Sequence, residues 1–574
     1  MANRKLAGIA VLAVSCAVLA ACGGGDSSVP DGPEVRSTTY GQIQGVDDTK
    51  NTGTYFWKGV PFAKPPVGAL RWKAPVEPAA WTGKLATKSF GNACIQNGRL
   101  YGPGTNNTYD ATIGTTLNTP VGSEDCLTLN IWRPANDTKD LPVILFLYGG
   151  SNISGYTADP VYDGAKLAKA ANAVVVTANY RVGPFGFFNL AQLKTGANAN
   201  DDSGNFAALD NIQALKFIQS NIANFGGNKN NVTVMGQSAG AINVWALVAS
   251  PLTSGLFHRA APLSGGISLQ SNLPAGALAT LSPASTYATQ ANLLLYHLLI
   301  ADGKATDIAS AQQYAANQTN AQIADYMRAK DAKTILTTLL LNGLTGSGPI
   351  PEGTVVPVDP IGAMAAGNYR KVPILASMTA EEGKLFQSLF ALLPGFPPGF
   401  IISDATRFEL MRTYKPDAAP AVTLTDLVDP FYLPPETPVT GYNAAAGFFT
   451  NNFFAPSRDN ALNTLITQQP NNVWYYQFNW AQEPAPWNVV YGAAHAFDLP
   501  FIFGNFGPSL FSSVVNSSAN APGRLALSDA MMSSIAAFAK NGDPNTAALG
   551  VNWAPWPKKL IFDASLTQKQ ITLQ

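Results

Sequence analysis

The stretch Val232-Thr-Val-Met-Gly-Gln-Ser-Ala-Gly-Ala241 runs from an apolar, β-branched segment into a serine between two glycines and then into a helix-like segment. Its centre, Gly236 to Gly240, has the pattern G-x-S-x-G. Because glycine has no side chain, both glycines fit a tight turn, which can hold Ser238 in a strained conformation with its hydroxyl projecting outward. The pattern indicates a nucleophilic serine between a strand and a helix. An ordinary Gly/Ser turn is the alternative.

The composition favours one large domain without a charged binding face. The length of 574 residues suggests several domains of about 150 residues each, but no Pro/Ser-rich or charged linker divides the chain after its first thirty-odd positions. Residues 34–574 are therefore interpreted as one domain. Charged residues make up only 13%, against about 25% in typical proteins, and the formal net charge is zero. No run of Lys or Arg offers a phosphate-binding face, so we expect no nucleic acid partner.

The N-terminus has the pattern of an export signal. Arg4 and Lys5 precede a long apolar run that ends in Leu-Ala-Ala-Cys22, a match to the bacterial lipobox. We expect residues 1–21 to be a lipoprotein signal peptide, Cys22 to be acylated, and residues 22–33 to be a flexible tether. An ordinary signal peptide, which would release a soluble periplasmic or secreted protein, is the alternative. Both predict export, and the first predicts a lipid anchor in the bacterial cell envelope.

Two cysteines, Cys94 and Cys126, remain in the predicted folded body, because Cys16 lies in the signal segment and Cys22 at the lipid site. In an oxidising compartment two such cysteines are a natural pair. The loop that they would close has about 32 residues, for which chain entropy gives roughly 3–4 kcal/mol of stabilisation. With so few cysteines and only three histidines, we expect neither a metal site nor a cofactor.

Alternating strand and helix patterns predict an α/β fold. Residues 141–148 and 173–178 are continuous apolar runs, as expected of central strands buried on both faces of a parallel sheet. Residues 205–223 carry apolar side chains at roughly helical spacing and end at a glycine stop. Residues 372–376 and 473–478 resemble later strands of the same sheet. Together these segments predict a doubly wound α/β unit.

Two long segments, 264–350 and 386–454, are irregular and rich in apolar residues. Such segments beside the carboxyl edge of a sheet commonly form the walls and mouth of a ligand cavity. The candidate wall residues, equally plausible as core, are Leu385, Phe386, Leu389, Phe390 and Phe396.

A nucleophilic serine needs a base, and the chain contains only His258, His297 and His495. His297 lies in an apolar, helix-like run and is expected in a core or wall. His258 follows the helix after the serine and is expected at the surface or at a helix end. His495 lies in a glycine-bearing loop downstream of the nucleophile, which is the hydrolase chain order. We therefore predict His495 as the base.

The acid that orients the base should follow a strand, and Glu381 and Glu382 lie directly after an apolar run. The pattern does not choose between these two carboxylates, and a solvated acidic turn is the alternative. For the oxyanion, Tyr148-Gly-Gly-Ser-Asn152 follows a buried strand and offers backbone amides, and the amide of Ala239 would be a further donor. A plain strand-exit turn is the alternative for that loop.

With these residues the chain resembles the type-B carboxylesterase/lipase family, which includes cholinesterases and bacterial p-nitrobenzyl esterases. The resemblance covers nearly the whole mature sequence. It rests on the ordered motifs Gly59-Val-Pro-Phe-Ala-Lys-Pro-Pro-Val-Gly-Ala-Leu-Arg71, Ser123-Glu-Asp-Cys-Leu-Thr-Leu-Asn-Ile-Trp132, Asn179-Tyr-Arg-Val-Gly-Pro-Phe-Gly-Phe187, Asn224-Phe-Gly-Gly227 and Phe538-Ala-Lys-Asn-Gly-Asp-Pro-Asn545. It implies an α/β-hydrolase fold, in which helices flank a large, mostly parallel twisted sheet and irregular insertions surround an active-site gorge.

The resemblance also implies a role for each candidate residue. Ser238 would be the nucleophile, His495 the base and Glu382, immediately before a glycine, the acid. The oxyanion donors would be the amides of Gly150, Ser151 and Ala239, and the disulfide would join Cys94 and Cys126. The implied activity is cofactor-free hydrolysis of small carboxylic esters through an acyl-enzyme. Lipase, lactonase and peptidase activities are alternatives on the same triad, and a non-catalytic adhesion protein is an alternative outside catalysis.

Three departures from the family pattern bear on the substrate. Gln237 stands where the family usually has Glu, which removes a negative charge beside the serine. The loop between the two cysteines contains Tyr101 and Tyr109 but no Trp, whereas cholinesterases use a loop tryptophan for quaternary ammonium groups. Ser151 replaces a common glycine, and its Cβ restricts the backbone. We therefore expect neutral, apolar esters rather than cationic ones as substrates.

Overall fold

The computed structural model describes residues 31–344 and 347–574. The chain divides after Gly32, and its second unit, Pro33–Gln574, is compact. The predicted signal peptide and the lipidation site at Cys22 lie outside the described residues. Within those residues, no helix has the length and apolarity needed to cross a membrane.

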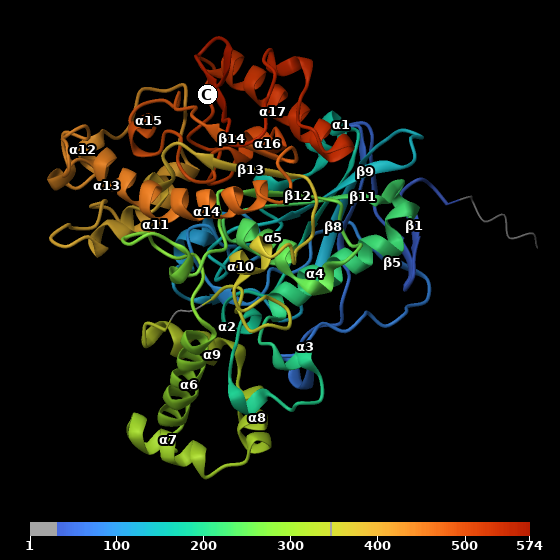
Figure 1. Cartoon of the computed structure of the whole chain (residues 1–574), viewed down its shortest axis with the longest axis vertical. Helices are drawn as coiled ribbons and strands as arrows, with labels where there is room; N and C mark the ends of the chain where they lie inside the picture. The colour runs from blue at the N-terminus through green and yellow to red at the C-terminus, as the bar shows by residue number, and fades with distance from the viewer. Residues whose placement is uncertain (1–30, 345–346) are drawn as a thin grey trace, which may run out of the picture. The chain divides into compact units, whose positions relative to one another are not determined.

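An 11-stranded sheet forms the centre of the second unit, in the order β16-β15-β14-β13-β12-β11-β9-β10-β8-β4-β3 (Figure 1). Neighbouring strands from β15 to β10 in this order are parallel, whereas β16 at one edge and β8, β4 and β3 at the other are antiparallel. The strands are β3 Val46–Asp48, β4 Thr54–Pro61, β8 Thr128–Pro134, β9 Leu141–Leu147, β10 Val174–Ala178, β11 Gly227–Gln237, β12 Arg259–Leu263, β13 Ile374–Thr379, β14 Val473–Phe478, β15 Leu560–Ala564 and β16 Lys569–Leu573. The predicted, mostly parallel α/β sheet is confirmed.

Helices cover both faces of this sheet, and for that reason β9 and β10 are buried along their whole length. Figure 1 shows α4 and α5 on one side of the central strands and α1, α16 and α17 on the other. The helices of these layers are α1 Ala165–Ala171, α4 Phe206–Asn221, α5 Ala239–Ala249, α10 Pro360–Ala365, α14 Ala455–Ile466, α16 Leu499–Phe503 and α17 Ala521–Asn541. The helix predicted over 205–223 corresponds to α4, which continues as a 3-10 turn to Gly226 at φ 79°.

Short elements complete the second unit. Two small sheets contain β1 Val35–Thr38, β2 Gly41–Gln44 and β5 Lys84–Ala86, and β6 Gln96–Asn97 with β7 Pro120–Val121. The short helices are α2 Gly183–Gly186, α3 Ala199–Asp202, α11 Asp404–Arg412, α12 Leu424–Leu427, α13 Tyr442–Phe449, α15 Trp487–Val490 and the 3-10 helices η8 Glu382–Leu385 and η9 Gln387–Leu392. The predicted Cys94–Cys126 disulfide is present, with both cysteines buried and their Cα atoms 4.9 Å apart.

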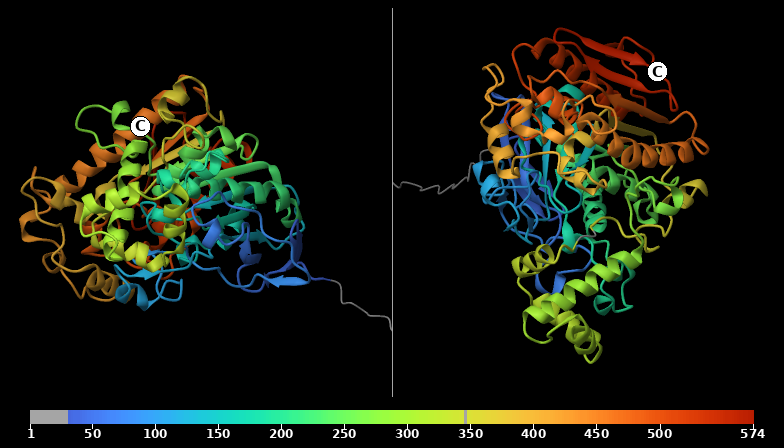
Figure 2. Two further views of the ribbon diagram at one scale, coloured as in Figure 1. Left: turned by 90° about the horizontal axis from the view of Figure 1, so that it is seen from below. Right: turned by 90° about the vertical axis from the view of Figure 1, so that its left-hand side faces the viewer.

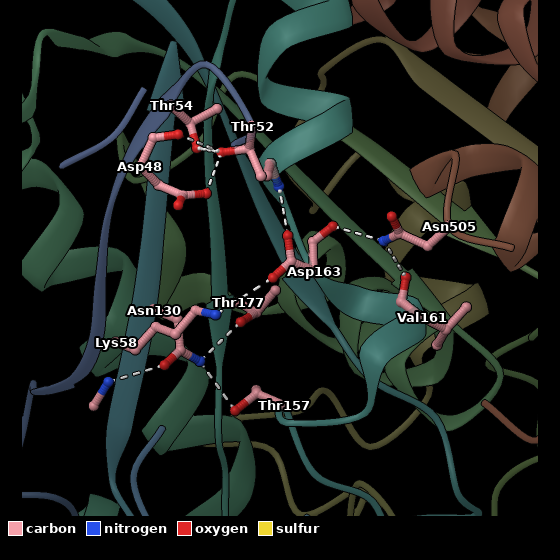
Figure 3. A network of polar contacts seen from close by, with 12 residues as sticks. Asp48, Thr52, Thr54, Lys58, Asn130, Thr157, Val161, Asp163, Thr177 and Asn505 are labelled. Carbon is pink, nitrogen blue, oxygen red and sulfur yellow. Dashed lines mark hydrogen bonds and ion pairs between the residues drawn. The ribbon is translucent and has the colours of Figure 1, made fainter. Parts of the chain in front are cut away.

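A buried polar network joins the antiparallel edge of the sheet to its centre (Figure 3). Asn130 on β8 donates from Nδ2 to the hydroxyls of Thr157 and Thr177, each at 3.0 Å. Its Oδ1 accepts the amide N–H of Gly59 at 2.9 Å. Because every polar atom of this buried amide has a partner, the network holds β4, β8 and β10 in register without an unsatisfied group.

Four helices between β12 and β13 form an insertion with its own apolar cluster. They are α6 Ala284–Ala301, α7 Ile308–Ala316, α8 Asn320–Ala329 and α9 Ala332–Leu341. Figures 1 and 2 show them grouped at one end of the second unit, away from the C-terminal strands. In this insertion Leu294, Leu295, Leu298, Ile335 and Leu336 pack together, separately from the core around the sheet.

Candidate active site

Ser238 lies at the turn between β11 and α5, with φ 60° and ψ −123°, a conformation that is strained for any residue with a side chain. The two flanking glycines permit this turn. A Cβ at Gly236 would lie 2.5 Å from the carbonyl oxygen of Gly240, and one at Gly240 would lie 2.0 Å from the carbonyl oxygen of Leu147. The elbow predicted from G-x-S-x-G is therefore required by backbone contacts.

The structure distinguishes the two adjacent glutamates after β13. The Glu382 carboxylate contacts Nδ1 of His495, and its other oxygen accepts the amide of Thr379 at 2.8 Å. Glu382 is fully buried. Glu381 instead forms an ion pair with Lys384 at 2.7 Å and is partly exposed. A carboxylate on Nδ1 fixes the orientation and the tautomer of the imidazole, which is the role of the third member of a triad.

The His495 ring packs against two aromatic side chains that also contact each other. The centres of Phe386 and Phe454 lie 5.1 and 5.0 Å from the centre of the imidazole. Its Nε2 lies 3.1 Å from Nε2 of Gln237, the residue before the serine. With a proton on Nδ1 facing Glu382, Nε2 is an acceptor for this amide, which is the neutral form that a general base needs.

The predicted oxyanion residues have free backbone donors. The amide of Ser238 itself is engaged, since it donates to the carbonyl of Leu263 at 2.9 Å. Among the hydrogen bonds of the described residues, none uses the amide N–H of Gly150, Ser151 or Ala239. Gly150 has φ 116° and Ser151 φ 55°, so the loop after β9 turns sharply beside the elbow. These amides can receive a developing negative charge on a substrate oxygen.

One cavity of about 450 Å³ contains the predicted serine, base and oxyanion residues. Leu385, Phe386 and Leu389 line it. Phe390 does not: it is fully buried and packs on the rings of Tyr432, Tyr442 and Phe449 in the core. The reason is that η9 directs consecutive side chains to different sides. Phe396 likewise packs against Phe431 and Tyr432.

The same cavity concentrates left-handed backbone conformations. Eleven non-glycine residues in the described chain have positive φ, and five of them line this cavity. These are Ser151, Asn152, Ser238, Ser264 and Ala496. Because such conformations persist only where the surroundings enforce them, their clustering supports a functional role for the cavity.

The other two histidines lie elsewhere. His258 precedes β12, is half-buried, and accepts the amide of Val232 at Nδ1 at 3.2 Å. Burial, followed by the charge of Arg259, lowers its pKa. His297 lies on α6 in the helical insertion and is also half-buried. Neither residue lines the cavity that contains Ser238.

Sequence reasoning missed one buried acid, Asp498. It lies three residues after His495, and its Oδ2 accepts the hydroxyl of Tyr476 at 3.1 Å. Its Oδ1 has no partner among the described residues. Burial, followed by the negative charge of Glu382, raises the pKa of Asp498 to about 7. The sequence could have pointed to Asp498, because this aspartate lies in the same loop as His495.

Comparison with known proteins gives the family. The family model described as "Carboxylesterase family" matches residues 32–571. The para-nitrobenzyl esterase of Bacillus subtilis is 29% identical over 93% of this chain and 96% of its own length. The fumonisin B1 esterase of Sphingopyxis macrogoltabida is 32% identical over 83% of this chain and 76% of its own length.

Solved structures of esterases are also similar to this chain. A structure named as a thermophilic PNB esterase superposes with a TM-score of 0.69 at 26% identity, covering 95% of this chain and 98% of the other. A carboxylesterase of Geobacillus stearothermophilus gives 0.68 at 27% identity, covering 94% and 98%. The predicted α/β-hydrolase fold and ester-hydrolase class are confirmed. The protein belongs to the carboxylesterase family.

Proposed function

We propose that Ser238, His495 and Glu382 carry out the ester hydrolysis of this family through an acyl-enzyme. The observation that carries the proposal is the buried contact between Glu382 and His495 beside the strained serine. His495 takes the proton of Ser238 as its oxygen attacks the ester carbonyl, and Glu382 stabilises the resulting imidazolium. The oxyanion forms against the amides of Gly150, Ser151 and Ala239, and the intermediate collapses as the His495 imidazolium gives its proton to the leaving alcohol.

In the second half of the cycle, His495 deprotonates a water molecule as the water oxygen attacks the acyl carbonyl. The His495 imidazolium then gives this proton to the Ser238 oxygen as the bond to the acyl group breaks and the acid leaves. Within the described residues no hydrogen bond joins Ser238 to His495, because Nε2 faces the Gln237 amide. Catalytic hydrogen bonds are often long without substrate. The proposal therefore includes a small rotation in which Nε2 leaves Gln237 and engages the serine hydroxyl.

The test is Ser238→Ala with p-nitrophenyl butyrate as substrate. We expect turnover to fall about 10⁴-fold or more, and a fluorescent organophosphonate to label the wild type but not the variant. The matched control is Ser285→Ala, at an exposed position of α6, which should keep both turnover and labelling. Undiminished turnover of Ser238→Ala would overturn the assignment.

We propose that the substrate is uncharged at its ester bond and that the groups attached to this bond are apolar. Gln237 supports this, because it contributes no negative charge beside the serine, and so do the apolar walls at Leu385, Phe386 and Leu389. The check is a comparison of butyrylcholine with an uncharged butyrate ester of similar size. A clear preference for the cationic ester would contradict the proposal.

We also propose that the chain is exported and lipid-anchored at Cys22, on the lipobox sequence alone. Metabolic labelling with a radioactive fatty acid should tag the wild type, and Cys22→Ala should abolish the label. An unlabelled wild type would leave an ordinary signal peptide as the correct interpretation.

A further inference from the structure

One cation that lines the cavity around Ser238 has no counterion among the described residues. The charged lining residues of this cavity, besides His495, are Arg99, Asp404 and Arg407. Asp404 pairs with Arg407 at 2.7 Å, and Arg407 also donates to Gln387 at 3.0 Å. Arg99 is half-buried, and no hydrogen bond or ion pair to another described residue holds its guanidinium. A partly desolvated guanidinium is costly unless a ligand pairs with it, and a carboxylate matches its geometry.

A second cavity of about 280 Å³ lies beside the first, between the helical insertion and the segment around α2. The two cavities share four lining residues, Arg99, Ser151, Ile153 and Ser347. Most of the other lining side chains are apolar, and among the described residues of its lining Arg99 is the one charged group. The volume is near the lower end of the roughly 300–1,000 Å³ of small-molecule sites.

The shared residues place Arg99 at the junction of the two cavities. One cavity holds the serine and the oxyanion amides, and the other is lined by Phe187 and Phe188 and by Leu294 and Leu336 from the insertion. A ligand that reached from Ser238 into the second cavity would pass the guanidinium. Such a ligand would be apolar along most of its length and would gain most from one negative charge.

We propose that Arg99 binds a carboxylate on the substrate and that the second cavity holds an apolar group of the same molecule. The substrate class is then an ester of an amphiphilic acid, with an uncharged ester bond at Ser238 and a free carboxylate remote from it. This inference rests on the proposed function. The proposed substrate is then uncharged at the ester bond that reacts with Ser238 but carries a negative charge elsewhere.

The first test compares two p-nitrophenyl esters with acyl chains of equal length: p-nitrophenyl octanoate and the mono-p-nitrophenyl ester of octanedioic acid. Arg99→Gln should lower kcat/KM for the anionic ester about tenfold or more, through KM, because a hydrogen bond to a charged group is lost. The octanoate should change little. Arg99→Lys should restore part of the activity on the anionic ester, since it keeps the charge.

The matched control is Arg412→Gln, which removes the same charge from an exposed pair with Glu409 and should affect neither ester. Equal loss on both esters in Arg99→Gln, or no loss on the anionic one, would overturn the role of Arg99. Turnover of p-nitrophenyl butyrate separates this result from a failure of the proposed function, because that short neutral ester depends on Ser238 and not on Arg99.

The second test fills the second cavity. Leu339 on α9 lines it and is only half-buried, so Leu339→Trp adds volume with little strain on the core. p-Nitrophenyl octanoate, whose uncharged chain can pass Arg99 into this cavity, should lose kcat/KM, while butyrate turnover and the melting temperature stay near wild type. Unchanged turnover of the octanoate in a folded variant would show that the second cavity does not receive the chain.

Discussion

The carboxyl edge of the sheet and the helical insertion are built on different principles. The edge holds buried charges, free amides and five non-glycine residues at positive φ around one cavity. The insertion, Ala284–Leu341, has no non-glycine residue at positive φ, and the side chains of Asp307, Thr319 and Asp331 cap its helices. Strained backbone conformations are thus concentrated at the edge, around the candidate active site, whereas the backbone of the insertion is locally favourable. We expect substitutions in the insertion to affect catalysis less.

We expect the largest effect from Glu382→Gln, which tests whether the contact with His495, and not merely a nearby carboxylate, is needed for catalysis. The neutral amide cannot stabilise the imidazolium, and it favours the wrong tautomer of His495, so kcat should fall about 10³–10⁴-fold. The comparison variant, Glu381→Gln, weakens a partly buried pair with Lys384 but leaves the contact between Glu382 and His495 in place, so kcat should change by less than about fivefold. Steady-state kinetics on p-nitrophenyl butyrate measure both. Similar losses in the two variants would show that position 382 has no special role.

Glycine substitutions compare the two regions directly. In Gly240→Ala the new Cβ would lie 2.0 Å from the Leu147 carbonyl oxygen, so the backbone must move, and we expect a loss of stability of about 4 kcal/mol or more. Gly303→Ala, after α6, meets open space at φ 69° and should cost only about 1–2 kcal/mol. Urea unfolding followed by circular dichroism measures both. Equal losses of stability in the two variants would show that the backbone at the sheet edge is no more constrained than the backbone of the insertion.

The smallest effect concerns pH and Asp498. Its pKa is raised to about 7 in the folded state, so the native protein holds a proton that the unfolded chain loses above about pH 4. The free energy of unfolding should therefore fall as pH rises from about 4 to 7. Asp498→Asn removes this dependence, and its stability relative to wild type should rise by about 1 kcal/mol or more over that range.

The difference in stability between Asp498→Asn and wild type is measured by thermal melting from pH 4.5 to 7.5. The control is Asp307→Asn in the insertion, because hydrogen bonds from Ser310 lower the pKa of Asp307 and its titration lies below the range measured. Its melting temperature should keep a constant offset from wild type. A constant offset for Asp498→Asn as well would mean that Asp498 is ionised throughout.

The sequence predicted the parts of the site that depend on local backbone. G-x-S-x-G specifies a turn that only glycine permits, and continuous apolar runs predicted β9 and β10. The choice between Glu381 and Glu382 needed the resemblance or the structure, since adjacent residues in an irregular turn can point either way. For Phe390 the sequence left a wall and a core position open, and its core position follows from packing on Tyr442 and Phe449.

Long-range placement could not be predicted from the chain. Arg99 and Ser238 are far apart in sequence, and only the folded sheet brings both to one cavity. The same is true of the contact between Gln237 and His495, which joins residues 258 positions apart. Charge pairing also depends on the fold. Within residues 31–344 and 347–574, Arg407 pairs with Asp404 and Arg99 pairs with no carboxylate, and no pattern in the sequence distinguishes these two arginines.

The Cys94–Cys126 disulfide has a further consequence for how this protein can change. Arg99 and Tyr101 lie inside the loop that it closes, whereas Ser238 lies on the sheet and Glu382 and His495 follow its strands. The cross-link fixes both ends of the loop to the buried core. The proposed carboxylate contact at Arg99 and the proposed triad therefore lie on separate segments, and we expect that exchanging the closed loop alters selectivity for anionic esters while Ser238, Glu382 and His495 keep their positions.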